Sequence, residues 1–155
     1  MGYTHYFPGL RATVEVLADA GKILDASAVT ICGPNGQGLP VMNETTGIRL
    51  NGFEAAGESY ETFHLRGTDP ARYPDMNDFC ETENKPYDQV VTAILIAAAV
   101  RAFDFKTGVV KSDGRWDNWA AGRQLYEQAV RLLTDQEKLA LELDLERMRP
   151  DPFQD

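Results

Sequence analysis

One apolar stretch constrains the fold of this chain more than any other feature of its sequence. Nearly every residue from Val90 to Val100 is apolar, and Pro86 and Asp88 precede the stretch. Both of these residue types suit the first turn of a helix, because proline lacks an N–H that would be unpaired there and a carboxylate favours the positive helix end. A helix without a polar face is buried on most sides. We therefore expect a core helix over residues 86–105, lying on a sheet.

Shorter patterns predict strands and further helices around this core helix. Segments 3–7, 29–32, 39–42, 48–50 and 60–65 are short, and several alternate in hydrophobicity or are rich in aromatic and β-branched residues, which is typical of strands. Helical spacing predicts one helix over residues 12–24 and another that opens at Trp116. The pair Asn51-Gly52 predicts a tight hairpin turn, and segment 111–114 predicts a second turn.

The segment that follows Leu133 allows two interpretations. Thr134 and Glu137 have the spacing of a capping box, which predicts a helix that begins at this point. Leucines in the same segment also alternate along the chain, which would suit a terminal strand. Those leucines are Leu139, Leu141, Leu143 and Leu145.

These elements together predict an α+β fold in a single domain over residues 1–155. The chain has 155 residues, of which 43% are hydrophobic and 25% charged, so it can bury a core of its own. We expect a small antiparallel sheet of about four or five strands, with strands first and helices after. The core helix and two or three further helices would cover one face of this sheet. Pro150 and Pro152 would end the last element, leaving a frayed tail from about residue 150.

The charge balance limits the classes of partner. The formal net charge is −9, from 15 Lys and Arg against 24 Asp and Glu, which argues against a long nucleic acid but leaves room for a small anion. No apolar run reaches the ~18–20 residues of a membrane span, and the first residues lack the pattern of a secretory signal. Cys32 and Cys80 are far apart and form no CxxC motif. These features predict a cytoplasmic protein with reduced thiols and no cofactor.

Three side chains are candidates for catalysis. His5 and His64 are the two histidines, and either could act as a general base. Cys80 precedes the start of the core helix, where the helix dipole and Lys85 would lower the pKa of its thiol. Neither histidine has a partner at a metal-ligand spacing, so we expect no metal site. A structural role remains the alternative for each of the three.

The start of the core helix is the predicted ligand site. Helix N-termini present free N–H groups, which bind anions, and a lysine directly precedes this one. We expect the first strand to lie beside the start of the core helix and to form a hollow with it. The imidazole of His5 and the phenol of Tyr6 would face this hollow. The predicted ligand-binding residues are His5, Tyr6, Arg49, Lys85, Tyr87 and Asp88, with His64 as a further donor.

Two phrases of the sequence resemble a known group of proteins. The opening Met1-Gly2-Tyr3-Thr4-His5-Tyr6-Phe7 and the phrase Phe79-Cys80-Glu81-Thr82 with Lys85-Pro86-Tyr87-Asp88 are similar to a family of small uncharacterised proteins from tailed bacteriophages and bacterial genomes. The resemblance implies a phage accessory protein that works in the cytoplasm of a bacterial host. By analogy with other small phage proteins, it implies a role against host defence through a nucleotide signal.

Three functions are compatible with these observations. The first is a binding protein that sequesters a small anionic, nucleotide-like ligand without turnover. The second is a hydrolase or transferase acting on a nucleotide, with His5 or His64 as general base and Lys85 stabilising negative charge. The third is an acidic protein that inhibits a host factor through its surface charge. The exposed edge of a small sheet also permits a homo-oligomer.

Overall fold

The computed structural model describes residues 2–69, 78–102 and 108–147. Helices and antiparallel strands are both present in these residues, so the predicted α+β class is confirmed. Within these ranges no helix is long and apolar enough to cross a membrane. The predicted helix end near Phe105, the tail from residue 150 and most of the loop 67–78 lie outside the described residues. The helices are α1 (Val14–Ala26), α2 (Asp88–Arg101), α3 (Ala120–Ala129) and α4 (Asp135–Glu146), and the strands are β1 (Thr4–Tyr6), β2 (Ile31–Cys32), β3 (Val41–Asn43), β4 (Gly47–Gly52), β5 (Phe63–Arg66), β6 (Phe79–Glu81) and β7 (Lys111–Ser112).

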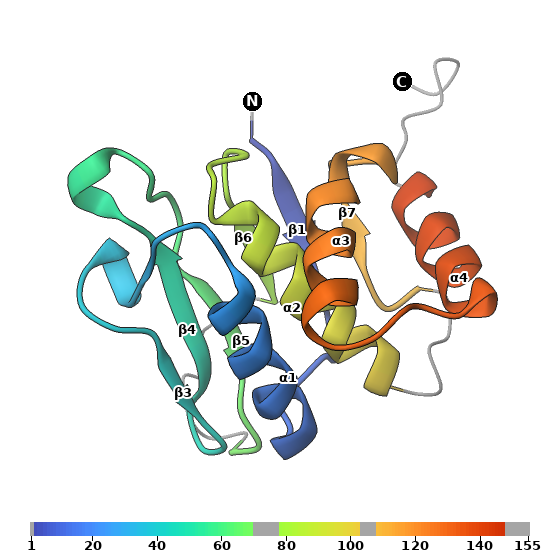
Figure 1. Ribbon diagram of the computed structural model, residues 1–155, viewed down its shortest axis with the longest axis horizontal. Coiled ribbons are helices and arrows are strands. Elements are labelled where there is room, and N and C mark those ends of the chain that lie inside the picture. The colour runs from blue at the N-terminus through green and yellow to red at the C-terminus, as the bar shows by residue number, and fades with distance from the viewer. Residues whose placement is uncertain (1, 70–77, 103–107, 148–155) are drawn as a thin grey trace.

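The apolar stretch forms α2, which lies at the centre of the fold as predicted. Every residue from Val90 to Ala99 is at most 2% exposed. The helix packs against α1 and α3, and the strands lie around it (Figure 1). A helix with no polar face removes all of its apolar surface from water only when other elements surround it. The sequence pattern therefore determines where this helix lies.

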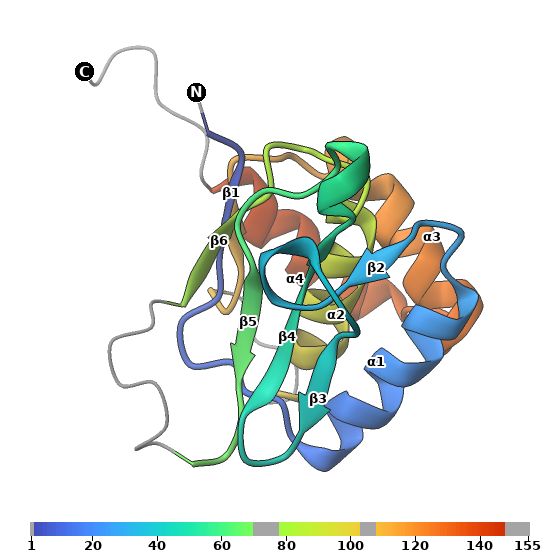
Figure 2. The same ribbon diagram turned by 90° about the vertical axis from the view of Figure 1, so that its left-hand side faces the viewer.

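The strands form two small antiparallel sheets and not the single sheet that we expected. In one sheet, β1 lies between β6 and β7. In the other, β4 pairs with β5 along one edge and with β2 and β3 along the other (Figure 2). The predicted order of strands first and helices after is wrong, because β6 and β7 come late in the chain. His5 pairs with both Cys80 and Ser112, and no local pattern encodes such distant pairings.

Two segments that the sequence predicts as turns belong to strands. Lys111–Ser112 forms β7, and Asn51-Gly52 ends β4, where it pairs with β2. The side chain of Asn51 acts like a strand partner: its Oδ1 accepts from the backbone N–H of Tyr60 at 3.0 Å, and its Nδ2 donates to the carbonyl of Tyr60 at 3.0 Å. These bonds outweigh the turn propensity of an Asn-Gly pair.

The ends of several other elements, among them α1 and β5, differ from the predicted ones by a few residues. The hydroxyl of Thr13 accepts a hydrogen bond from the N–H of Val16, so α1 begins after this cap, at Val14. β5 begins only at Phe63, and the hydroxyl of the preceding Thr62 accepts a hydrogen bond from Nδ2 of Asn51 at 3.2 Å. The start of α1 depends on a side-chain hydrogen bond, which periodicity does not report.

The last element is a helix, and the alternative terminal strand is wrong. Thr134 and Glu137 form the predicted capping box, and α4 follows it. Residues two positions apart on a helix point to nearly opposite sides. Leu141 is buried, whereas Leu139 and Leu143 are 57% and 47% exposed. The alternating leucines therefore belong to two faces of one helix.

Candidate functional site

His5 reaches the start of α2, as the sequence predicts. This side chain of β1 is fully buried. Its Nε2 lies 2.6 Å from Oδ1 of Asp88, the first residue of α2, and its Nδ1 lies 2.7 Å from Oγ of Ser112 in β7. Thr82 also donates its hydroxyl to Oδ1 of Asp88, at 2.6 Å. Two segments 83 residues apart therefore meet in one polar network.

The donors around Ser112 determine the tautomer of His5. The Oγ of Ser112 accepts from the backbone N–H of Gly114 at 2.8 Å and from Nε1–H of Trp119 at 3.1 Å. An amide N–H and an indole N–H can only donate, so the hydroxyl hydrogen of Ser112 points to Nδ1 of His5. The imidazole then carries its proton on Nε2 and donates it to Asp88. Both ring nitrogens of His5 thus have partners inside the protein.

The hollow that we expected between His5 and α2 is filled. The rings of Tyr3 and Trp119 stand edge-on to the imidazole, with centroids 5.2 and 5.1 Å away. Tyr87 is fully buried and donates its hydroxyl to the carbonyl of Glu61 at 2.6 Å. Burial raises the pKa of the Tyr87 hydroxyl above its ordinary value. These contacts leave no space for a ligand between the two segments, and this part of the prediction is corrected.

Lys85 and Asp88 do share a surface pocket at the start of α2. Its volume is about 140 Å³, and its lining includes Asn84, Gln89 and Asn118. The Nζ of Lys85 donates to the carbonyl of Gly57 at 3.3 Å. The pocket is smaller than the ~300–1,000 Å³ typical of ligand sites.

Arg49 and His64 lie in the other sheet, where they are cross-strand partners in β4 and β5. His64 is nearly buried, and its Nε2 donates to the carbonyl of Thr46 at 3.1 Å. Burial lowers the pKa of His64 below its ordinary value, and Arg49 and Arg66 lower it further. The structure therefore places these two residues in a different sheet from His5.

Tyr6 and Cys80 take packing positions. The ring of Tyr6 packs against that of Phe79 in a tilted arrangement, with ring centroids 6.1 Å apart. Cys80 is fully buried, and its Sγ lies 3.7 Å from the carbonyl oxygen of Glu61. Burial raises the pKa of the Cys80 thiol, with Glu61 and Asp88 adding to the effect. The predicted lowering of this pKa is wrong, and the thiol has the properties of a packed side chain.

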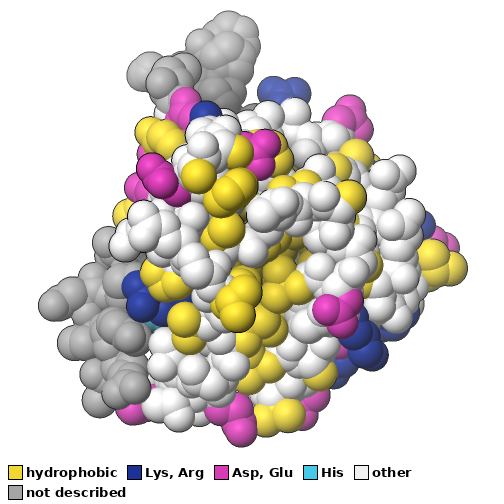
Figure 3. Space-filling view, turned by 60° about the vertical axis from the view of Figure 1, so that its left-hand side comes forward, with side chains coloured by type: hydrophobic (Ala, Val, Ile, Leu, Met, Phe, Trp, Pro, Cys, Tyr) yellow, Lys and Arg dark blue, Asp and Glu magenta, His cyan; other side chains and the backbone are white. Residues whose placement is uncertain are grey.

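An apolar hollow is one candidate site on the described part of the surface. Figure 3 shows hydrophobic side chains in a hollow on the face formed by α1 and the β2–β5 sheet. An apolar wall offers no hydrogen-bond donor to an anion. The partly buried hydrophobic residues of α1, β2 and β3 that pack against the core are Leu17, Leu24, Ile31 and Met42.

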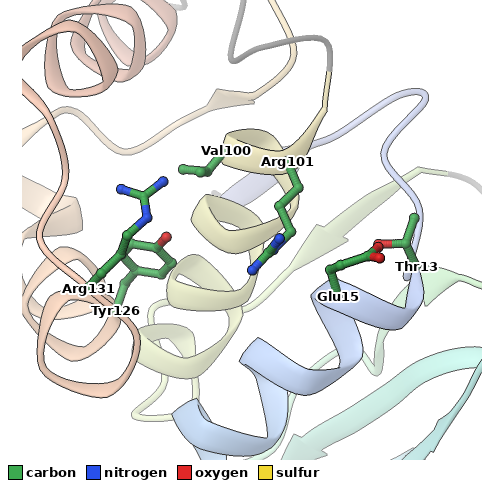
Figure 4. Close-up of a pocket in the computed structure, with 6 residues that line it drawn as sticks. All are labelled: Thr13, Glu15, Val100, Arg101, Tyr126 and Arg131. Atoms are coloured by element: carbon green, nitrogen blue, oxygen red, sulfur yellow. The ribbon is translucent and has the colours of Figure 1, made fainter.

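A second candidate site is a pocket of about 540 Å³ with two arginines in its lining. Arg101 ends α2, and Arg131 follows α3, so the two come from different elements. Figure 4 shows Arg101 and Arg131 at two separate places around the pocket that both line, with Tyr126 of α3 beside Arg131. The lining residues are Thr13, Glu15, Val100, Arg101, Tyr126 and Arg131. We call this space the arginine pocket.

A carboxylate holds each guanidinium of the arginine pocket in place. Asp19, which is 2% exposed, accepts from Nε and Nη2 of Arg101 at 2.7 and 3.3 Å. Glu137 accepts from Nη1 and Nη2 of Arg131 at 2.8 and 2.9 Å. These hydrogen bonds raise the pKa of both arginines. The cations are therefore fixed in position and permanently charged.

The arginines keep N–H donors for a ligand. A guanidinium carries five N–H donors. Arg101 uses two of them on Asp19. Arg131 uses three, two on Glu137 and one on the carbonyl of Leu132. The remaining donors are fixed on two planar groups, which is the arrangement that suits the oxygens of a phosphate or carboxylate.

Metal binding has no comparable support. No three His, Cys, Asp or Glu side chains come together as metal ligands in the part of the chain that the structure describes. The arginine pocket itself offers one carboxylate, Glu15, beside the two guanidinium groups.

Sequence reasoning missed the arginine pocket because neither arginine stands in a motif. Arg101 follows the apolar stretch and has the position of a cation that stabilises a helix C-terminus. Arg131 lies between two helices in a polar neighbourhood. Only the packing of α1, α2 and α3 brings them to one space.

Comparison of the chain with protein-family models, curated proteins and solved structures found no match.

Proposed function

We propose that this protein binds a small anionic ligand of nucleotide size in the arginine pocket and holds it without converting it. The observation that carries the proposal is that Arg101 and Arg131, from separate elements, face one pocket of about 540 Å³. That volume lies within the ~300–1,000 Å³ of typical ligand sites. The proposed ligand is a small anion, as expected from the sequence, but the proposed binding site is the arginine pocket and not the hollow beside His5.

The lining residues suit a ligand in which a phosphate or carboxylate is attached to a planar or polar group. Guanidinium groups bind such oxygens through paired N–H bonds, and both are oriented before the ligand arrives. The ring of Tyr126 and the methyl groups of Val100 offer apolar contact. Burial raises the pKa of the Tyr126 hydroxyl, so this group stays protonated and neutral.

Binding without turnover fits the residues around the pocket. Its lining contains no imidazole and no thiol, and His5, His64 and Cys80 line neither this pocket nor the smaller one beside Lys85. The hydroxyl of Thr13 accepts from Val16 N–H as the cap of α1. In the host cytoplasm that the phage resemblance implies, a protein of this kind would lower the free concentration of a nucleotide signal.

Calorimetric titration with AMP and with adenosine tests the proposal. AMP should bind and adenosine should bind at least about tenfold more weakly, because hydrogen bonds to a charged group contribute roughly 1.5–3 kcal/mol. Arg131→Gln should weaken AMP binding by about the same factor. Arg115→Gln removes an exposed arginine that lines none of these pockets and should leave binding unchanged.

The fate of the ligand separates binding from catalysis. AMP released from the denatured complex should elute unchanged on chromatography. Conversion of AMP to a product would show that the protein is an enzyme. Equal affinity for AMP and adenosine, or no binding of either, would contradict the proposed function.

A further inference from the structure

A second pocket adjoins the arginine pocket and shares two of its lining residues. It has a volume of about 240 Å³. Thr13 and Arg101 line both pockets, so Arg101 stands at their junction. The residues that line the second pocket are Gly9, Arg11, Thr13, Val16, Ala98, Arg101 and Ala102. We call it the Arg11 pocket.

We infer that the ligand carries two anionic groups on a short scaffold, one held in the arginine pocket and the other in the Arg11 pocket. This inference rests on the proposed function, since it extends the same binding site. It narrows the ligand class from mononucleotides to molecules such as dinucleotides, whose second phosphate lies a few bonds from the first.

The charge around Arg11 is the first reason for a second anionic group. Asp78 is the carboxylate beside Arg11, with 3.5 Å between the charged atoms, and it also binds Arg66 at 3.1 Å. Among the described residues, two cations thus share one anion, which gives this part of the cluster a net positive charge. In the arginine pocket, by contrast, each cation has a carboxylate of its own. The surplus charge makes Arg11 the stronger attractor of a further anion.

The lining of the Arg11 pocket is the second reason. Among the described residues that line it, the charged side chains are Arg11 and Arg101, and none is a carboxylate. The remaining side chains are small or apolar, such as Ala98 and Ala102. Attraction between charges is stronger beside an apolar wall than in open water. An anionic group that enters this pocket therefore meets two cations, whose carboxylate partners Asp19 and Asp78 lie outside its described lining.

Arg101 can serve both groups of one ligand. It uses two of its five N–H donors on Asp19, which leaves three. A guanidinium at the junction can donate to one anionic group on each side. Joining two such groups in one molecule increases affinity, because the second contact forms at a high effective concentration.

The test compares the affinities of AMP and the linear dinucleotide pApA, which carries a 5′-phosphate and a phosphodiester. For the native protein, pApA should bind at least about tenfold more tightly than AMP. In Arg11→Gln the ratio of the two affinities should fall to near one. Arg115→Gln should keep the native ratio. Thermal melting of each variant checks that it folds.

The outcomes separate this inference from the proposed function. Binding of AMP with no preference for pApA, or an unchanged ratio in Arg11→Gln, would overturn the second anionic group and leave the proposed function standing. Failure of both AMP and pApA to bind would overturn both proposals. A high ratio that depends on Arg11 supports both.

Discussion

At the scale of single residues, His5 shows how a polar side chain can be fully buried at low cost. Its two ring nitrogens, the hydroxyl of Ser112 and the carboxylate of Asp88 satisfy one another. A buried polar group is expensive only when it lacks a partner. The network joins two strands to the start of α2, so we assign it a structural role in holding the first sheet on the core helix.

Replacing His5 by alanine should destabilise the protein strongly. The change removes Nε2 of His5, which is a hydrogen-bond partner of the buried carboxylate of Asp88. It also opens a cavity between Tyr3 and Trp119. We expect a loss of about 3–5 kcal/mol in the free energy of unfolding, measured with urea. Lys85→Gln, at the surface nearby, should change it by less than about 0.5 kcal/mol. Equal stability of the native protein and His5→Ala would contradict the structural role.

The thiol of Cys80 should not react in the folded protein. It is fully buried, and burial raises its pKa, so both access and thiolate formation are disfavoured. Iodoacetamide at pH 8, followed by peptide mass spectrometry, should label Cys80 only after denaturation. Rapid labelling of the native protein at this position would show that the thiol is exposed and activated.

At the scale of elements, two helical glycines occupy opposite environments. Gly21 in α1 has open space where a Cβ would lie. Gly122 in α3 lies against α2, and its added Cβ would stand 2.8 Å from the Cβ of Thr92. The same chemical change therefore tests helix propensity at one site and helix packing at the other.

Substituting alanine at each glycine should change stability in opposite directions. Gly21→Ala should raise the free energy of unfolding by roughly 0.5–1 kcal/mol, because alanine costs less entropy in a helix. Gly122→Ala should lower it by about 1–3 kcal/mol, because α3 must move away from α2. Urea denaturation of both variants measures the two effects. A stabilising Gly122→Ala would show that the two helices do not pack this closely.

The start of α4 should make stability depend on pH in the acidic range. Hydrogen bonds from Arg131 lower the pKa of Glu137 from its ordinary 4.5 to about 2. A carboxylate whose pKa is lower in the folded state stabilises the fold above its ordinary pKa and loses this effect as the pH falls through its folded value. The contribution should therefore be complete above about pH 5 and disappear towards pH 2.

Glu137→Gln isolates this contribution. At pH 7 the variant should be about 1–2 kcal/mol less stable, since it loses the ion pair and weakens the cap. The difference between the melting temperatures of native and variant protein should shrink below about pH 4.5 and vanish near pH 2. A difference that stays constant from pH 7 to pH 2 would contradict the pairing with Arg131.

At the scale of the whole molecule, the sequence predicts what local patterns encode. The burial of α2 follows from its composition, and the start of α4 follows from Thr134 and Glu137. The division of the strands into two sheets does not follow from local patterns, because β7 has only two residues and depends on pairing with β1. The arginine pocket depends on the packing of three helices, and neither Arg101 nor Arg131 differs locally from an ordinary surface cation.

The net charge of the chain is negative, and the cations of the two pockets act only at short range. The chain has a formal net charge of −9, so a distant anion is repelled. Near the surface, a ligand meets Arg11, Arg101 and Arg131, each in a fixed position. Salt screens the repulsion over about 8–10 Å, whereas contacts in a pocket are screened less. Selectivity for anions is therefore a property of the pockets.

A crystal structure of the protein grown with AMP tests the central claim most directly. The account predicts phosphate density within hydrogen-bonding distance of the guanidinium groups of both Arg101 and Arg131, at about 2.7–3.2 Å. Phosphate bound instead at the start of α2, beside Lys85 and Asp88, would contradict it. An arginine pocket that stays free of AMP at a concentration that saturates binding in solution would contradict it equally.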